Sequence, residues 1–265
     1  MSMTWHWRPR FSLEPTTALH DGRLMNSLVF PLVLLVSAWL PAARADALEP
    51  FVATYQAYNE GKLAGNATMR LVHNTDPQWR VDLGIHGNRG FAGILALNIE
   101  QSTVFDAAAD HYRPLTQSTV RKALMFFGKK TVGVYDWSSR TARWRGDLKK
   151  DRTQAVPLQD GDMSGLLINL AVIRDAVPGK QLQYRFVDGG RVRDHLYQVA
   201  EQTENIKIGE LSYEAMRVSR TNGGNDETIL WVASGVPTPV RILQRTDGHD
   251  AVDLRLIEYQ GTQNP

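Results

Sequence analysis

The segment Gln78–Gly87, "QWRVDLGIHG", alternates apolar and polar residues. Its apolar side chains fall on one face of an extended chain, and most of its polar side chains fall on the other. The apolar set is Trp79, Val81, Leu83 and Ile85. Because successive side chains of a β-strand point to opposite faces, this period of two predicts a strand with one buried face.

Similar segments lie on both sides of this one, separated by turn sequences rich in Gly, Asn and Asp. Asp188-Gly189-Gly190 and Asp247-Gly248 are typical of β-hairpin turns. We therefore expect a mainly β fold, with about a dozen strands in one large antiparallel sheet or an incomplete β-barrel. The expected strands include 51–58, 66–74, 114–122, 130–137, 141–147 and 251–260. A hairpin is expected at 181–200, while 90–106 fits either a strand or a helix.

Gln159–Leu170, "QDGDMSGLLINL", interrupts this strand pattern. Apolar residues after Ser164 recur with the period of a helix, and "VPGK" at 177–180 ends the segment with Pro and Gly. This predicts one central α-helix near 162–176, which we expect to plug or lid the barrel.

Asp160, Asp162 and Ser164 lie at the expected start of this helix. Short polar side chains there accept hydrogen bonds from the free N–H groups of the first turn, and acids complement the helix dipole. Capping therefore explains most of the motif. Two alternatives stay open, a ligand-binding loop and a hydrolase site in which these residues meet a histidine or an arginine such as Arg241.

The N-terminal region carries the pattern of an export signal. Leu28–Leu40 is an apolar run of 13 residues, shorter than the roughly 20 residues that span a bilayer as a helix. Ala43-Arg44-Ala45 follows as a cleavage site of the A-x-A kind. We expect a misassigned or disordered extension at 1–24, a signal peptide at 25–45 cleaved after Ala45, and a single mainly β periplasmic domain at 46–265.

Charge balance and cysteine content argue against several classes of protein. The chain has 30 Lys and Arg against 28 Asp and Glu. Residues 1–45 hold four arginines and two acids, so they account for the whole excess, and a nucleic-acid partner is not expected. The absence of cysteine excludes disulfides, thiolate ligands and a cysteine lipid anchor. No transmembrane span is expected in the mature chain.

Two stretches are candidate contact sites. Met125, Phe126 and Phe127 belong to an apolar run flanked by basic residues, which fits a cavity lining, a contact site or a strand buried on both faces. Arg143, Trp144 and Arg145 form a basic stretch with one aromatic residue. It fits either a patch for an anionic lipid, a glycan or a protein, or an edge hairpin protected by charge.

Recognisable catalytic motifs are absent from the sequence. The histidines after residue 45 have no metal-binding spacing, and there is no nucleophile elbow, phosphate-binding loop or dinucleotide fingerprint. We therefore expect no catalytic residues, no metal and no cofactor, and the interpretation leans away from an enzyme.

Several motifs together resemble the exported bacterial family catalogued as domain of unknown function three-one-zero-eight. The resemblance covers Phe51–Tyr259 and implies a periplasmic, mostly β domain, with no activity or site residues to transfer. The motifs are "YQAYNEGKLAGNATMRL" (55–71), "YDWSSRTA" (135–142), "GDMSGLLINLAV" (161–172), "GKQLQYRFVDGGR" (179–191) and "PVRILQRTDGHDAVDLRLIEY" (239–259).

The leading hypothesis is a soluble periplasmic β-protein that binds an apolar or envelope-derived ligand or acts as an envelope accessory factor. One alternative is a protein–protein interaction module for secretion or surface assembly, with an exposed patch and no sizeable cavity. The other is the hydrolase built on Asp160, Asp162 and Ser164.

Overall fold

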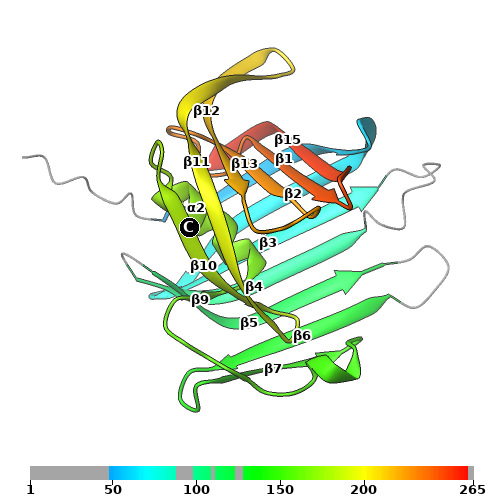
Figure 1. Ribbon diagram of the computed structural model, residues 1–265, viewed down its shortest axis with the longest axis vertical. Coiled ribbons are helices and arrows are strands. Elements are labelled where there is room, and N and C mark those ends of the chain that lie inside the picture. The colour runs from blue at the N-terminus through cyan, green and yellow to red at the C-terminus, as the bar shows by residue number, and fades with distance from the viewer. Residues whose placement is uncertain (1–47, 88–97, 109–110, 123–127, 262–265) are drawn as a thin grey trace, which may run out of the picture. The chain divides into compact units, whose positions relative to one another are not determined.

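The computed structural model describes residues 48–87, 98–108, 111–122 and 128–261. They form one 15-stranded sheet, which confirms the mainly β fold (Figure 1). The strand order is β8-β7-β6-β5-β4-β3-β2-β1-β15-β14-β13-β12-β11-β10-β9. Every neighbouring pair is antiparallel except β9 and β10, which run parallel.

Strands β2 to β7 follow one another both along the chain and across the sheet. Tight turns connect β1 to β2, β2 to β3 and β6 to β7, as is common in antiparallel hairpins. The first half of the domain consists of β1 (Phe51–Asn59), β2 (Lys62–Thr75), β3 (Gln78–Gly87), β4 (Ile99–Ala107), β5 (Tyr112–Arg121), β6 (Lys129–Asp136), β7 (Thr141–Gly146), the 3-10 turn η1 (Lys150–Arg152) and β8 (Val156–Pro157).

The second half returns to the other side of β1, because β15 pairs with β1. The last described strand, β15, therefore lies beside β1, the first strand along the chain. This half consists of β9 (Asp162–Met163), the helix α2 (Gly165–Asp175), β10 (Gln181–Asp188), β11 (Arg191–Ile208), β12 (Leu211–Arg220), β13 (Thr228–Ala233), β14 (Arg241–Thr246) and β15 (His249–Gly261).

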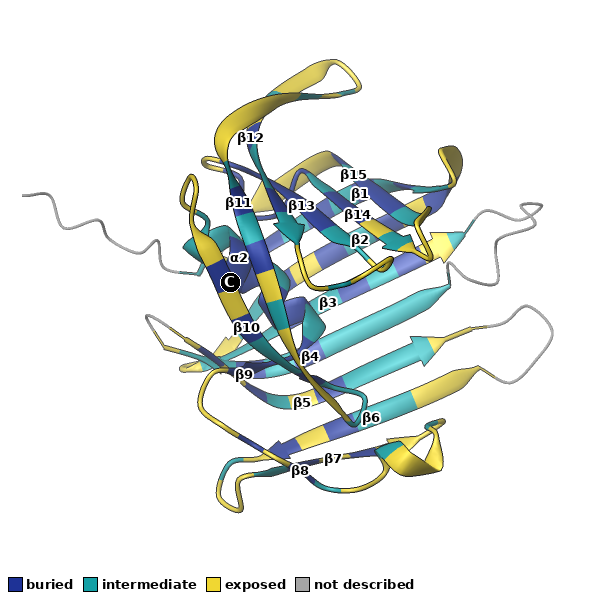
Figure 2. Cartoon of the chain, in the orientation of Figure 1, coloured by how far each residue is buried: buried dark blue, intermediate teal, exposed yellow. Residues whose placement is uncertain are grey.

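The inner face of the sheet carries the core. Val81, Leu83 and Ile85 of β3 are buried, as their alternation predicted (Figure 2). The same alternation runs through β1, where every second residue from Phe51 to Ala57 is buried. One face of these strands therefore supplies the apolar surface whose removal from water drives folding.

Helix α2 lies against this inner face, in contact with β10 on one side and with β3, β4 and β5 on the other. It is shorter than the predicted 162–176, because Asp162 and Met163 pair with β10 as a strand and Ser164 is the N-cap. None of its residues is exposed, so it forms an internal wall of the barrel-like sheet. Its buried residues are Leu166, Leu167, Ile168, Leu170, Ala171 and Val172.

The two ends of the sheet meet through side chains. Val187 of β10 packs against Tyr135 and Trp144 of β6 and β7 in a small second core. The Tyr135 hydroxyl donates a 2.6 Å hydrogen bond to the Val187 carbonyl. Burial raises the pKa of Tyr135, so this hydroxyl keeps its proton and remains a donor. No strand ladder joins β6 or β7 to β10 among the described residues, so these contacts close the sheet.

Trp144 fits this junction because Gly133 stands opposite it on β6. A Cβ atom at residue 133 would collide with the Trp144 indole, so only glycine leaves the ring its place. The indole N–H then donates a 2.9 Å hydrogen bond to the side-chain oxygen of Gln117 on β5. Gly133 on β6 thereby leaves room for Trp144 on β7 to pack where the two ends of the sheet meet.

The hairpin of β11 and β12 extends away from the rest of the sheet (Figure 1). Its tip is exposed, as the yellow segment in Figure 2 shows, and Leu211 is 53% exposed. On either side of the tip, Thr203–Ile208 pairs in register with Leu211–Met216.

Candidate functional site

A cavity of about 420 Å³ lies between the inner face of the sheet and helix α2. Its wall comes from both halves of the chain, since β3, β4, β5 and β6 line one side and β10, β11, β14 and β15 line another. The apolar residues of its lining are Leu83, Ile85, Ile99, Leu148, Leu166, Ile168, Phe186, Tyr197, Ile242, Val252 and Leu254.

The lining becomes more polar toward solvent. Leu254 and Ile168 are buried, whereas Arg121, Lys129 and Arg191 are exposed. The cavity therefore has an apolar floor and an open, charged end. We call the four cations that line it, Arg121, Lys129, Arg152 and Arg191, the cationic rim.

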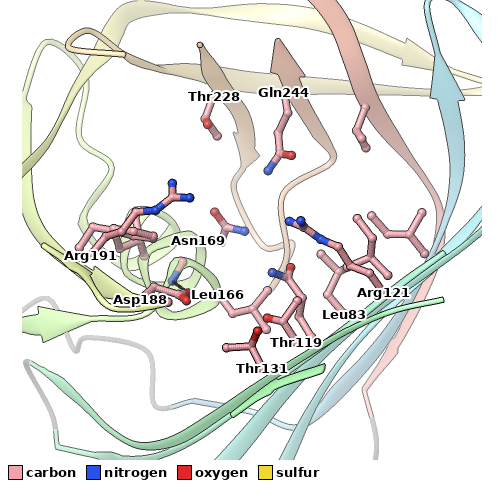
Figure 3. Close-up of a pocket in the computed structure, with 18 of the residues that line it drawn as sticks. Leu83, Thr119, Arg121, Thr131, Leu166, Asn169, Asp188, Arg191, Thr228 and Gln244 are labelled. Atoms are coloured by element: carbon pink, nitrogen blue, oxygen red, sulfur yellow. Dashed lines mark hydrogen bonds between the residues drawn. The ribbon is translucent and has the colours of Figure 1, made fainter. Parts of the chain in front are cut away.

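Figure 3 shows how the labelled side chains lie around the cavity. Arg191 extends into it from one wall and Arg121 from the opposite wall. Asn169 of α2 lies between them, and Gln244 and Thr228 point inward from a third side. Long cationic and amide side chains thus converge on one region above the apolar floor.

The rim cations outnumber the acids of the cavity lining by four to two. Among the residues that the structure describes, none of the four forms an ion pair. Burial lowers the pKa of the Arg191 guanidinium, and the nearby charges of Arg152, Arg193 and Arg121 lower it further, while Asp188 acts in the opposite direction. Arg191 therefore lies in a region of surplus positive charge.

Two acids also line the cavity, and Asp188 interacts electrostatically with Arg191 and Arg121 of the rim. Asp147 accepts a 2.8 Å hydrogen bond from the backbone N–H of Lys130. Asp188 accepts one of 2.7 Å from the Gln117 amide and one of 3.4 Å from the Gly165 N–H. Burial raises the pKa of Asp188, so the protein favours its neutral form more than water does.

His195 contributes an aromatic surface to the cavity and no formal charge. Its ring stacks on Phe186 with 4.5 Å between the ring centroids. Burial lowers the pKa of His195 to about 4, and the charges of Arg220 and Arg193 act in the same direction. The imidazole is therefore neutral near pH 7.

Asp162 and Ser164 are occupied by structural partners. Asp162 is fully buried and binds the Arg185 guanidinium at 2.5 and 2.6 Å. The Ser164 hydroxyl accepts from the Leu167 N–H at 3.4 Å and shares a 2.9 Å hydrogen bond with Thr103 of β4. Neither residue lines the cavity.

Asp160 lies apart from these two. It is exposed, 3.7 Å from the Arg140 guanidinium, and lines a second hollow of about 430 Å³ with His111 and Trp137. Arg241, the suggested catalytic partner, instead binds the buried Asp253 on β15. The three residues of the loop therefore do not converge on one site.

The other candidate contact residues divide between the two faces of β7. Trp144 is buried in the closure, while Arg143 and Arg145 are exposed on the opposite side of the strand. None of the three lines the cavity. Strand β7 lies next to the two-residue edge strand β8, consistent with a charged edge hairpin. Met125, Phe126 and Phe127 lie outside the described residues, so their role stays a prediction.

The cationic rim was not identified from the sequence. Its members lie at the ends of separate strands or in η1, up to 70 positions apart in the chain. The sequence around each of them contains no recognisable binding motif. One available indication was Arg191, which directly follows the Asp188-Gly189-Gly190 turn and therefore had to lie near a strand end.

Other kinds of site are not found within the described residues. No group of three or more His, Cys, Asp or Glu side chains there is arranged to hold a metal ion. No helix there is long and apolar enough to cross a membrane.

Solved structures with limited similarity to this chain include two proteins of unknown function. A β-barrel-like protein of domain of unknown function DUF1849 from Brucella abortus is 12% identical, with a TM-score of 0.44, over 82% of this chain and 99% of that chain. A DUF1089 family protein from Pseudomonas aeruginosa is 13% identical, with a TM-score of 0.34, over 66% of this chain and 87% of that chain. No family model and no curated protein matches the chain.

Replacing Ser164 is expected to lower the free energy of unfolding more than replacing Asp160 does. Ser164→Ala removes the N-cap and leaves Thr103 without its buried partner, so it should lower the free energy of unfolding by about 1–2 kcal/mol. Asp160→Asn affects only an exposed pair and should change it by less than about 0.5 kcal/mol. Urea unfolding of both variants checks this. A larger loss for Asp160→Asn than for Ser164→Ala would contradict the structural role.

Proposed function

We propose that this chain is a binding protein whose ligand inserts an apolar part into the cavity between α2 and the sheet. The observation that carries the proposal is the cavity itself, with buried aliphatic residues at its floor and an open end. Its volume of about 420 Å³ lies within the range of small-molecule sites, roughly 300–1,000 Å³. A few polar side chains at one end of an apolar pocket are typical of sites that fix a ligand's orientation.

The cavity favours this function over the two alternatives. A module that acts only through protein–protein contacts has no need of an internal space, and filling that space with side chains would stabilise the fold. The hydrolase hypothesis needs Asp162 and Ser164 to face a substrate, but both side chains are engaged by Arg185 and Thr103.

The neutral fluorophore N-phenyl-1-naphthylamine tests the proposal, because its emission rises in an apolar site. Leu83 lies in the cavity wall and Leu63 is 50% exposed on β2, so the two leucines form a matched pair. We expect the wild type to bind the probe, and Leu83→Phe to weaken binding about tenfold by filling the space, a loss near 1.4 kcal/mol. Leu63→Phe should bind like the wild type.

Urea unfolding of both variants controls for misfolding. Absence of probe binding by the wild type would overturn the proposal. So would equal binding by the wild type and a folded Leu83→Phe variant, since the fluorophore would then lie elsewhere.

We further propose that the protein acts in the periplasm, as a member of the family catalogued as domain of unknown function three-one-zero-eight. The apolar run at Leu28–Leu40 and the Ala43-Arg44-Ala45 site support export, and the motifs between Phe51 and Tyr259 support the family. An exported protein with an internal cavity is suited to carrying or sensing an envelope-derived apolar compound.

Export is tested by expressing the full chain in a Gram-negative host and separating the periplasm from the cytoplasm. We expect a periplasmic product whose N-terminal residue is Asp46. Replacing Ala43 and Ala45 with bulky residues should leave the uncleaved precursor with the membrane fraction. An uncleaved wild-type chain in the cytoplasm would contradict export.

A further inference from the structure

The charges at the mouth of the cavity restrict the chemistry of its ligand. The cationic rim contributes four basic side chains, none of them in an ion pair among the described residues. Of the two acids in the lining, Asp147 is held by a backbone N–H, and Asp188 is held by Gln117 and Gly165. With four cations and two acids, the cavity lining therefore carries a formal excess of two positive charges.

The arrangement of the rim is suited to holding a small anionic group. Arg121 at the end of β5 and Arg191 at the start of β11 extend toward each other from opposite walls (Figure 3). A guanidinium binds a carboxylate or phosphate through two parallel N–H bonds, so two facing arginines can hold one anion from both sides. Asn169 and Gln244 add amide groups beside them.

The apolar floor begins immediately below these groups. Leu166 of α2 and Leu83 of β3 line the same cavity and are buried. An anion with no hydrocarbon part would leave this surface uncovered, and a neutral hydrocarbon would leave the arginines without a partner. One molecule that satisfies both regions must be amphipathic.

Resting on the proposed binding function, we propose that the ligand is an amphipathic anion, with a carboxylate or phosphate head between Arg121 and Arg191 and a hydrocarbon tail against α2. Its negative head offsets the excess of cations over acids in the cavity lining. Its tail replaces water at the aliphatic floor, which supplies the larger part of the affinity.

Displacement of bound N-phenyl-1-naphthylamine tests this at pH 7 with four competitors: decanoate, decyl phosphate, decanol and inorganic phosphate. The two anionic amphiphiles should displace the probe at concentrations about tenfold lower than decanol does. Their relative strength decides between a carboxylate and a phosphate head. Inorganic phosphate should not displace the probe, because it has no tail.

Charge variants locate the head group. Arg121→Gln and Arg191→Gln should each weaken decanoate binding several-fold, and together about tenfold or more, and each loss should exceed the loss of decanol binding in the same variant. The matched control is the double variant Arg143→Gln and Arg145→Gln, which removes the same charge from the exposed face of β7 and should bind like the wild type. Raising the salt concentration should weaken binding of the anions only.

Each other outcome overturns the proposal. Equal displacement by decanol and decanoate, or equal losses in the rim and β7 double variants, would show that Arg121 and Arg191 do not hold the head group while the cavity still binds apolar molecules. Displacement by inorganic phosphate as strong as that by decyl phosphate would show that no tail is needed. Failure of the wild type to bind the probe would instead remove the binding function itself.

Discussion

The hydrogen bond from the Tyr135 hydroxyl to the Val187 carbonyl, with the small core around it, is the contact on which the rest of the structure depends. A sheet of 15 strands that ended in two free edges would leave its inner face open to water. Ordinary barrels solve this with a continuous ladder of backbone bonds. Here the strands at the two ends are only two residues long, and side chains of β6 and β7 make the junction.

This manner of closure explains why a helix lies inside a β-protein. The curved sheet encloses a space wider than its own side chains fill, and α2 occupies part of it with apolar residues on nearly all sides. Ser164 fixes the start of the helix to Thr103 of β4, and Asp188 fixes it to β10 through the Gly165 N–H. The volume that α2 leaves unfilled is the cavity, so the closure and the candidate site share their walls.

Most of the strands and the helix were predictable from local pattern. The alternation in Gln78–Gly87 gave β3 its bounds, and the Pro-Gly ending together with Ser164 located α2 to within a few residues. Asp162 shortened the helix because its carboxylate meets Arg185, a partner 23 positions away that no local pattern reveals.

The candidate site depended on long-range geometry and was therefore beyond the reach of local pattern. The "GDMSG" segment and Trp144 form a visible local pattern because small, acidic or aromatic residues are concentrated there. In the structure, Ser164 caps α2 and Trp144 packs where the two ends of the sheet meet. Arg121 and Arg191 looked ordinary because each is a single basic residue at a strand end. Only the curvature of the sheet brings them to opposite walls of one cavity.

The most direct test of this account compares Tyr135→Phe with Tyr58→Phe by urea unfolding. Both changes remove one hydroxyl that donates a hydrogen bond, to the Val187 carbonyl at the junction or to the Gln56 side chain away from it. If the junction closes the sheet, Tyr135→Phe should lower the free energy of unfolding by about 1–3 kcal/mol, against less than about 0.5 kcal/mol for Tyr58→Phe. Equal, small losses in the two variants would contradict the central claim.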